Sequence, residues 1–110
     1  MQLYRAIKGK RPRSSDFWSD FACGEDPIVP VQTDRPSMWW GVSMSDDFDR
    51  AKRKALELTQ GRYIAVMQIP DDAEHVRTVQ TSTKRDPHHY SVVGSPTSLG
   101  SCFVESVPIT

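Results

Sequence analysis

Two serines, Ser43 and Ser45, stand where an apolar, strand-forming run gives way to the start of an acidic helix. Residues 39–42 read Trp-Trp-Gly-Val, and residues 46–49 read Asp-Asp-Phe-Asp. A hydroxyl at the tip of a strand can hydrogen-bond a polar ligand or orient a cationic side chain. The plainer alternatives are that Ser43 is only a polar neighbour of the cap and that Ser45 is the N-cap of the following helix.

Arg5 lies in a short alternating run, residues 3–7, that favours a β-strand. Alternation puts Arg5 on the face that it shares with Leu3 and Ile7. Its planar guanidinium suits phosphate or ribose oxygens, although an arginine in a strand can also simply pair with an acid. Lys8 begins a basic stretch over residues 8–13, which is either a solvated loop or a site for phosphate-bearing ligands.

The histidines and cysteines follow no familiar metal-binding spacing. His88 and His89 are adjacent, so their side chains project to opposite sides if they lie in a strand, and the alternative is that both belong to a loop. A nucleophilic Cys–His pair is equally unconstrained by the sequence. We therefore predict no metal site, and we expect Cys23 and Cys102 to be reduced, partly buried thiols.

The order of the expected helices and strands that position these residues predicts an α+β domain with a mostly antiparallel sheet. Residues 14–16 offer an N-cap to a short helix over residues 17–22, and the proline-containing residues 24–37 have the composition of a surface loop that can act as a lid. A longer helix, capped by Ser45 and closed by Gly61, has an apolar stripe and a basic opposite side. Strands are expected at residues 3–7, 39–42, 62–69, 76–79, 90–93 and 102–109, with a polar loop joining the last two.

Size and composition exclude several classes of protein. The 110 residues suit a single domain, residues 1–110. No apolar run reaches the roughly 20 residues that a bilayer span needs, so no membrane partner is expected. A formal net charge of zero argues against a dedicated nucleic-acid binder. The first residues carry no signal-peptide pattern, and we therefore expect a cytoplasmic protein.

The order of these segments resembles the ADP-ribosyltransferase superfold, the NAD-binding fold of bacterial mono-ADP-ribosylating toxins and poly-ADP-ribose polymerases. Residues 3–5 are similar to the first strand of that family, which carries an Arg or His that holds NAD. Residues 41–45, GVSMS, with the helix that follows, resemble a second strand ending in a Ser-Thr-Ser or Gly-x-Tyr pattern. RYIAVMQI and HYSVVGSPTSLGSCFVESV are similar to the later strands.

The resemblance implies a small, mostly antiparallel split sheet with two short helices, and a cleft between two small sheets in which Arg5, Ser43 and His89 meet. Flat rings such as Trp39 and Tyr63 would stack on nicotinamide. The implied catalytic residues are Arg5, Ser43, His89 and Glu105. The implied NAD-binding residues are Arg5, Lys8, Ser43, Ser45, Trp39, Tyr63 and His88.

This chain departs from the family at the head of the penultimate strand, where the family has a glutamate and this sequence has His89. A neutral imidazole can hold a hydroxyl, but it cannot supply the negative charge that stabilises an oxocarbenium-like state. Glu105 is the only late glutamate, and alternation also allows it to face outward. Some transferases of this superfold that remove a phosphate from RNA use Arg and His without a glutamate.

Two classes of function follow from the resemblance. As an enzyme, the protein would be a small NAD-dependent ADP-ribosyltransferase, a bacterial or phage toxin or effector that modifies an unidentified protein or nucleic acid. As a binding module, it would hold an ADP-ribose-like or nucleotide ligand without turnover, or serve as a protein-interaction surface. The sequence leaves the oligomeric state open.

Overall fold

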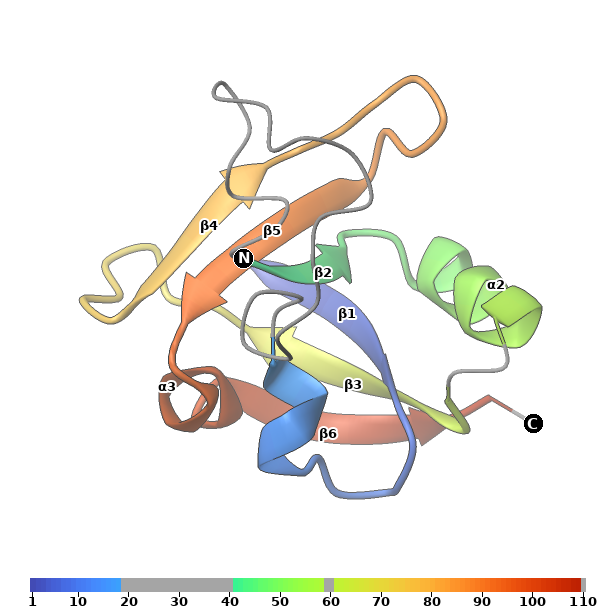
Figure 1. Ribbon diagram of the computed structural model, residues 1–110, viewed down its shortest axis with the longest axis horizontal. Helices are drawn as coiled ribbons and strands as arrows, with labels where there is room; N and C mark the ends of the chain where they lie inside the picture. Colours follow the sequence, from blue (N-terminus) through green and yellow to red (C-terminus); the bar gives the residue numbers. More distant parts are fainter. Residues whose placement is uncertain (19–40, 59–60, 110) are drawn as a thin grey trace.

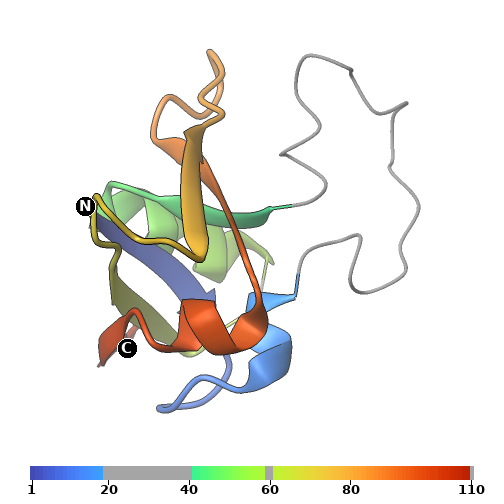
Figure 2. The same ribbon diagram turned by 90° about the vertical axis from the view of Figure 1, so that its left-hand side faces the viewer.

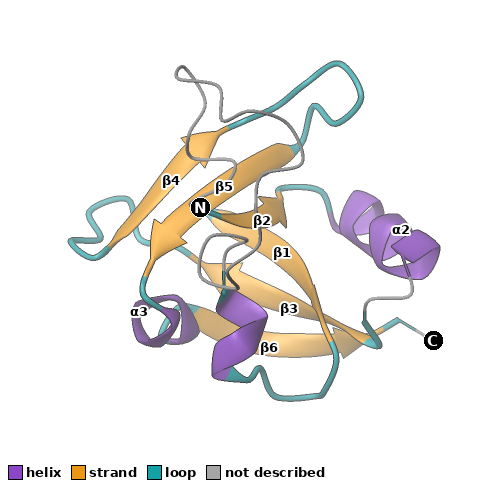
Figure 3. Cartoon of the chain, in the orientation of Figure 1, coloured by secondary structure: helices purple, strands orange, loops and turns teal. Residues whose placement is uncertain are grey.

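A computed structural model describes residues 1–18, 41–58 and 61–109. The predicted lid, residues 19–22 of the first predicted helix, Cys23 and Trp39 lie outside the described residues. The α+β class is confirmed (Figure 3). The described elements are β1 (Gln2–Ile7), η1 (a 3-10 helix, Ser14–Phe17), β2 (Val42–Ser45), α2 (Phe48–Leu58), β3 (Tyr63–Gln68), β4 (Val76–Gln80), β5 (His89–Gly94), α3 (Pro96–Gly100) and β6 (Phe103–Pro108).

The strands form one open sheet in the order β4-β5-β2-β1-β3-β6, and each of its pairings is antiparallel (Figure 1). The prediction of a split sheet is therefore wrong, because a single residue pair, Tyr4 with Ser45, still joins β1 to β2. On its other side β1 pairs with β3 along its full length. The sheet is thus continuous but narrowly joined between β2 and β1.

The alternation predicted for β1 separates the two faces of the sheet. Leu3 and Ile7 are completely buried in a core that also contains Phe17 of η1 and Leu99 of α3. Figures 1 and 2 show η1 and α3 side by side. Tyr4 and Ala6 pack instead against the small cluster under α2. Helices η1 and α3 therefore cover one face of β1, and α2 covers the other, as the period of two in a strand requires.

Helix α2 carries the predicted apolar stripe, but its N-cap differs from the prediction. Ala51 and Ala55 are buried, and Phe48 meets the ring of Tyr4 edge to face at a centroid distance of 5.5 Å. The cap is Asp47, whose Oδ1 accepts the backbone N–H of Arg50 at 3.0 Å. Ser45 is not the N-cap, because its backbone is held in β2 by pairing with β1 and β5.

The loop predicted between the last two strands contains a short helix, α3. Ser95 caps it by accepting the backbone N–H of Ser98 at 3.1 Å, and Pro96 occupies its first turn. Serine followed by proline is a helix-start signal that the turn interpretation overlooked. Leu99 gains complete burial from this helix, which explains why the segment is not a plain loop. The strand expected at residues 76–79 is present as β4, at one edge of the sheet.

Candidate functional site

A cavity of about 280 Å³ lies where β1 and β2 separate, under one side of α2. Residues 4–6 of β1, residues 43–45 of β2, Arg50, Ala51, Lys54 and Ala55 of α2, and Asp86 and His89 line it. A second hollow of about 620 Å³ lies at β4 and contains none of the predicted site residues. The first cavity is therefore the candidate site.

The structure brings Arg5, Ser43 and His89 from three separate segments to the lining of this cavity, as their positions were predicted to converge. The narrow join between β1 and β2 explains how these residues come together. Since the strands pair at only one position, side chains from both faces of β1 reach the space between them. The cleft lies within one sheet, not between two sheets. The roles of these residues in binding or catalysis stay predictions.

Arg5 holds the strands and η1 together beside the cavity. Its Nε donates to the backbone carbonyl of Asp16 at 2.7 Å, and its Nη1 donates to the carbonyl of Ser43 at 2.8 Å. The second bond crosses from β1 to β2 beyond their single residue pair. These contacts fix the direction of the guanidinium, which is what a binding group requires before a ligand arrives.

His89 ends a chain of buried polar side chains. Its Nδ1 lies 2.5 Å from the Thr81 hydroxyl, which lies 3.0 Å from the hydroxyl of Ser91. All three residues are buried. Burial, reinforced by the positive charge of Lys54, lowers the pKa of His89 below 6.5, and the negative charge of Asp86 opposes this only in part. His89 is therefore neutral at neutral pH.

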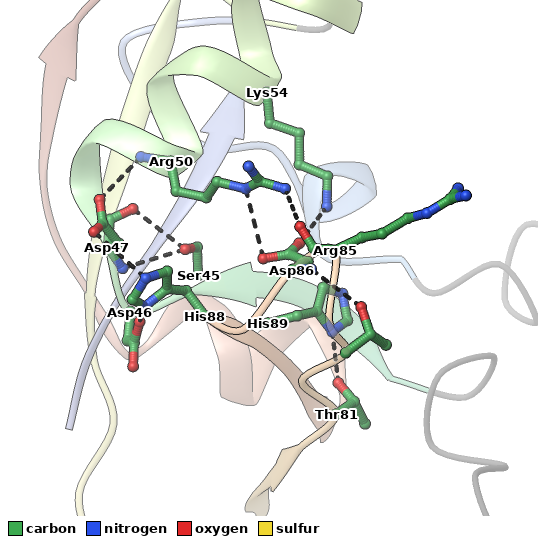
Figure 4. A network of polar contacts seen from close by, with 11 residues as sticks. Ser45, Asp46, Asp47, Arg50, Lys54, Thr81, Arg85, Asp86, His88 and His89 are labelled. Carbon is green, nitrogen blue, oxygen red and sulfur yellow. Dashed lines mark hydrogen bonds and ion pairs between the residues drawn. The ribbon is translucent and has the colours of Figure 1, made fainter.

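Asp86 meets two cations of α2 at the cavity (Figure 4). Its Oδ2 accepts a hydrogen bond from Lys54 Nζ at 3.1 Å, and its Oδ1 lies 3.7 Å from Arg50 Nε. Burial would raise the pKa of Asp86, but the hydrogen bond and charge of Lys54, with His89 and Arg50, lower it further than burial raises it. Asp86 is thus an ionised carboxylate that faces the cations of α2.

Several predicted site residues do not line the cavity. Lys8 is exposed, and Tyr63 packs against the main core, where its ring cannot stack on a ligand in this cavity. Glu105 is exposed on β6, two strands from β1. β6 is an edge strand, and Glu105 is exposed on it. The structure therefore shows the outward-facing alternative for Glu105.

His88 belongs to a different polar contact from His89. Its Nδ1 lies 2.7 Å from Asp46 Oδ1, and its Nε2 lies 3.8 Å from Asp47 Oδ2. These contacts tie the chain before β5 to the start of α2. His88 does not line the cavity, because adjacent residues of an extended chain project in opposite directions.

Three charged lining residues were missed by the sequence analysis: Arg50, Lys54 and Asp86. The two cations are four residues apart, and this spacing places them one above the other on the same side of a helix. That signal was present in the sequence. Asp86 gave no local signal, since the segment between β4 and β5 reaches the cavity only after these strands pair.

No family model, curated protein or solved structure gives a significant match to the chain. The described residues contain no group of three His, Cys, Asp or Glu side chains arranged to hold a metal ion. Within the same residues, every helix is too short or too polar to cross a membrane.

Proposed function

We propose that this chain is an ADP-ribosyltransferase-like protein that binds NAD in the cavity between β1, β2 and α2. The observation that carries the proposal is the position of Arg5, Ser43 and His89, which line this one cavity although they come from three separate segments. Arg5 would hold phosphate or ribose oxygens, and the Ser43 hydroxyl and neutral His89 would hold ribose hydroxyls. The reacting part of NAD would then lie against β1 and β2.

The size of the cavity supports binding of one part of the dinucleotide. Ligand pockets commonly measure roughly 300–1,000 Å³. At about 280 Å³ the cavity suits a single nucleoside or ribose phosphate. The remainder of NAD would extend beyond these lining residues.

A second candidate function, binding without turnover, is favoured by the acids near the cavity. Asp86 is the only acid among its described lining residues, and it is already engaged by Lys54 and Arg50. Glu105 lies elsewhere. Cleavage of the nicotinamide bond develops positive charge on the ribose, and a carboxylate paired with two cations stabilises that charge weakly.

Binding is tested by titrating NAD into the wild type and Arg5→Ala in a calorimeter. We expect the substitution to weaken binding by about 1.5–3 kcal/mol, the range for a lost charged hydrogen bond. Lys8→Ala is the matched control, because Lys8 is exposed and does not line the cavity. Arg5→Lys serves as a second variant that keeps the charge. Equal affinity of all four proteins, or no binding by the wild type, would refute the proposal.

Turnover is tested by measuring nicotinamide released from NAD by the wild type. Release that is lost in His89→Gln would establish the enzyme. NAD binding without release would instead establish the binding module, with the same residues serving recognition alone.

A further inference from the structure

Two cations of α2, Arg50 and Lys54, face the carboxylate of Asp86 in the part of the cavity that the structure describes. The neighbouring His89 is neutral at neutral pH. The two cations of α2 direct their charged ends to the same point, as Figure 4 shows. Two cations whose charged ends converge on one point attract an anion through the sum of their charges.

The Asp86 carboxylate makes an incomplete set of hydrogen bonds at this point. Its Oδ1 is buried and has no hydrogen-bond partner among the described residues. Arg50 Nε lies 3.7 Å from it, which makes an ion pair without a hydrogen bond. Arg50 instead donates from Nη2 to the backbone carbonyl of Arg85 at 2.7 Å. A buried acceptor left unbonded is costly, so this carboxylate is a poor match for the two cations that face it.

The segment that carries Asp86 is a turn between two strands. The Asp86 N–H donates to the Thr83 hydroxyl at 3.1 Å, and its carbonyl accepts the Thr83 N–H at 3.0 Å. These are local bonds. The Arg50 bond to the Arg85 carbonyl also ties the turn to α2. The carboxylate can therefore leave Arg50 and Lys54 by rotation of the Asp86 side chain, with these backbone bonds in place.

We propose that Arg50 and Lys54 form a subsite for a phosphoryl group of the ligand, and that the Asp86 carboxylate occupies this subsite when no ligand is bound. A phosphoryl group offers more acceptor oxygens than a carboxylate, so it can bond both cations at once. The inference deepens the proposed function, on which it rests for the identity of the ligand, because a nucleotide carries such a group. The Asp86 carboxylate then competes with the ligand.

The test uses inorganic pyrophosphate as the probe, titrated by calorimetry at fixed ionic strength. Asp86→Asn keeps the shape of the side chain and removes its charge, and we expect it to bind pyrophosphate about tenfold more tightly than the wild type does. Lys54→Gln should weaken binding by a similar factor, and Lys54→Arg should retain it. Lys52→Gln is the matched control, since Lys52 is on the same helix but does not line the cavity.

The double variant Asp86→Asn with Lys54→Gln removes both charges of the Lys54–Asp86 pair, and it should lose the gain seen in Asp86→Asn. The proposal is overturned if Asp86→Asn binds pyrophosphate no more tightly than the wild type, or if Lys52→Gln weakens binding as much as Lys54→Gln. If the pyrophosphate results are as expected but NAD does not bind, the proposed subsite stands and NAD is excluded as the ligand. If NAD binding depends on Arg5 but Asp86→Asn does not change pyrophosphate affinity, the proposed function stands and the subsite is excluded.

Discussion

At the scale of single residues, His89 combines burial with a titratable ring. Its neighbours are Thr81 on Nδ1, the positive charge of Lys54 and the negative charge of Asp86. Because burial is the largest of these influences, the folded protein disfavours the protonated ring. The site therefore carries its positive charge on Arg and Lys and not on histidine.

This burial predicts a pH dependence of stability. The pKa of His89 is lower in the folded state than the ordinary 6.5, so the unfolded state binds more protons as the pH falls through this window. The contribution of His89 is complete above about 6.5 and is lost as the pH falls toward the lowered pKa. Urea unfolding between about pH 7.5 and 5.5 should show a smaller loss in His89→Gln than in the wild type.

The matched control for this measurement is His75→Gln, because His75 is exposed. It should keep the wild-type dependence on pH. An identical dependence in the wild type and His89→Gln would show that His89 does not titrate against folding.

Glu105 is the residue for which the sequence allowed the sharpest alternatives. On the exposed side of β6, Glu105→Gln should change the free energy of unfolding by no more than about 0.5 kcal/mol. NAD affinity and any nicotinamide release should also stay unchanged, because the side chain does not line the cavity. Loss of release with unchanged affinity would place Glu105 at the ribose and contradict this assignment.

At the scale of elements, α2 connects the cap, the core and the site. Its apolar stripe docks on β1, and Arg50 and Lys54, each next to an alanine of that stripe, line the cavity. The cap at Asp47 sets where the first turn begins and hence where these cations point. An error of two residues in the helix start therefore matters for the site.

The cap predicts a difference between two substitutions at one position. Asp47→Ala should lower the free energy of unfolding by about 1 kcal/mol, since the Arg50 N–H loses its acceptor. Asp47→Asn keeps an acceptor and should lose less. Chemical denaturation measures both. Equal losses would mean that the charge of Asp47, which lies 3.8 Å from His88 Nε2, matters more than the cap.

At the scale of the whole molecule, Gly61, just before β3, lies very close to β1. A Cβ atom placed on Gly61 would lie 2.8 Å from the backbone oxygen of Ile7, and the Arg62 N–H donates to that same oxygen at 3.1 Å. Since both partners are backbone, neither can move without disturbing the pairing of β1 with β3. This glycine therefore permits the close approach of the two segments.

Gly61→Ala should destabilise the protein by about 1–3 kcal/mol, the range for overpacking at a tight site. Gly100→Ala is the control, because its added Cβ would lie 3.9 Å from the ring of Phe17, an ordinary contact. Thermal or denaturant unfolding compares the two. A loss in Gly100→Ala equal to that in Gly61→Ala would contradict the close approach at Gly61.

The sequence by itself determined the features whose signals are local. Alternation in residues 3–7 placed Leu3 and Ile7 on one face, and the stripe of Ala51 and Ala55 identified the core side of α2. These patterns repeat over a few residues, so their periods can be read without knowing the partners. The α+β class followed from the order of such segments.

Only the tertiary structure decided which strands are neighbours and what meets in the space between them. The single pair of Tyr4 with Ser45 opens the cavity, and pairing of β4 with β5 delivers Asp86 to the cations of α2. The outward position of Glu105 likewise depends on the register of β6 against β3. Register and strand order arise from contacts between residues far apart in the chain, and a local pattern of side chains fits more than one such arrangement.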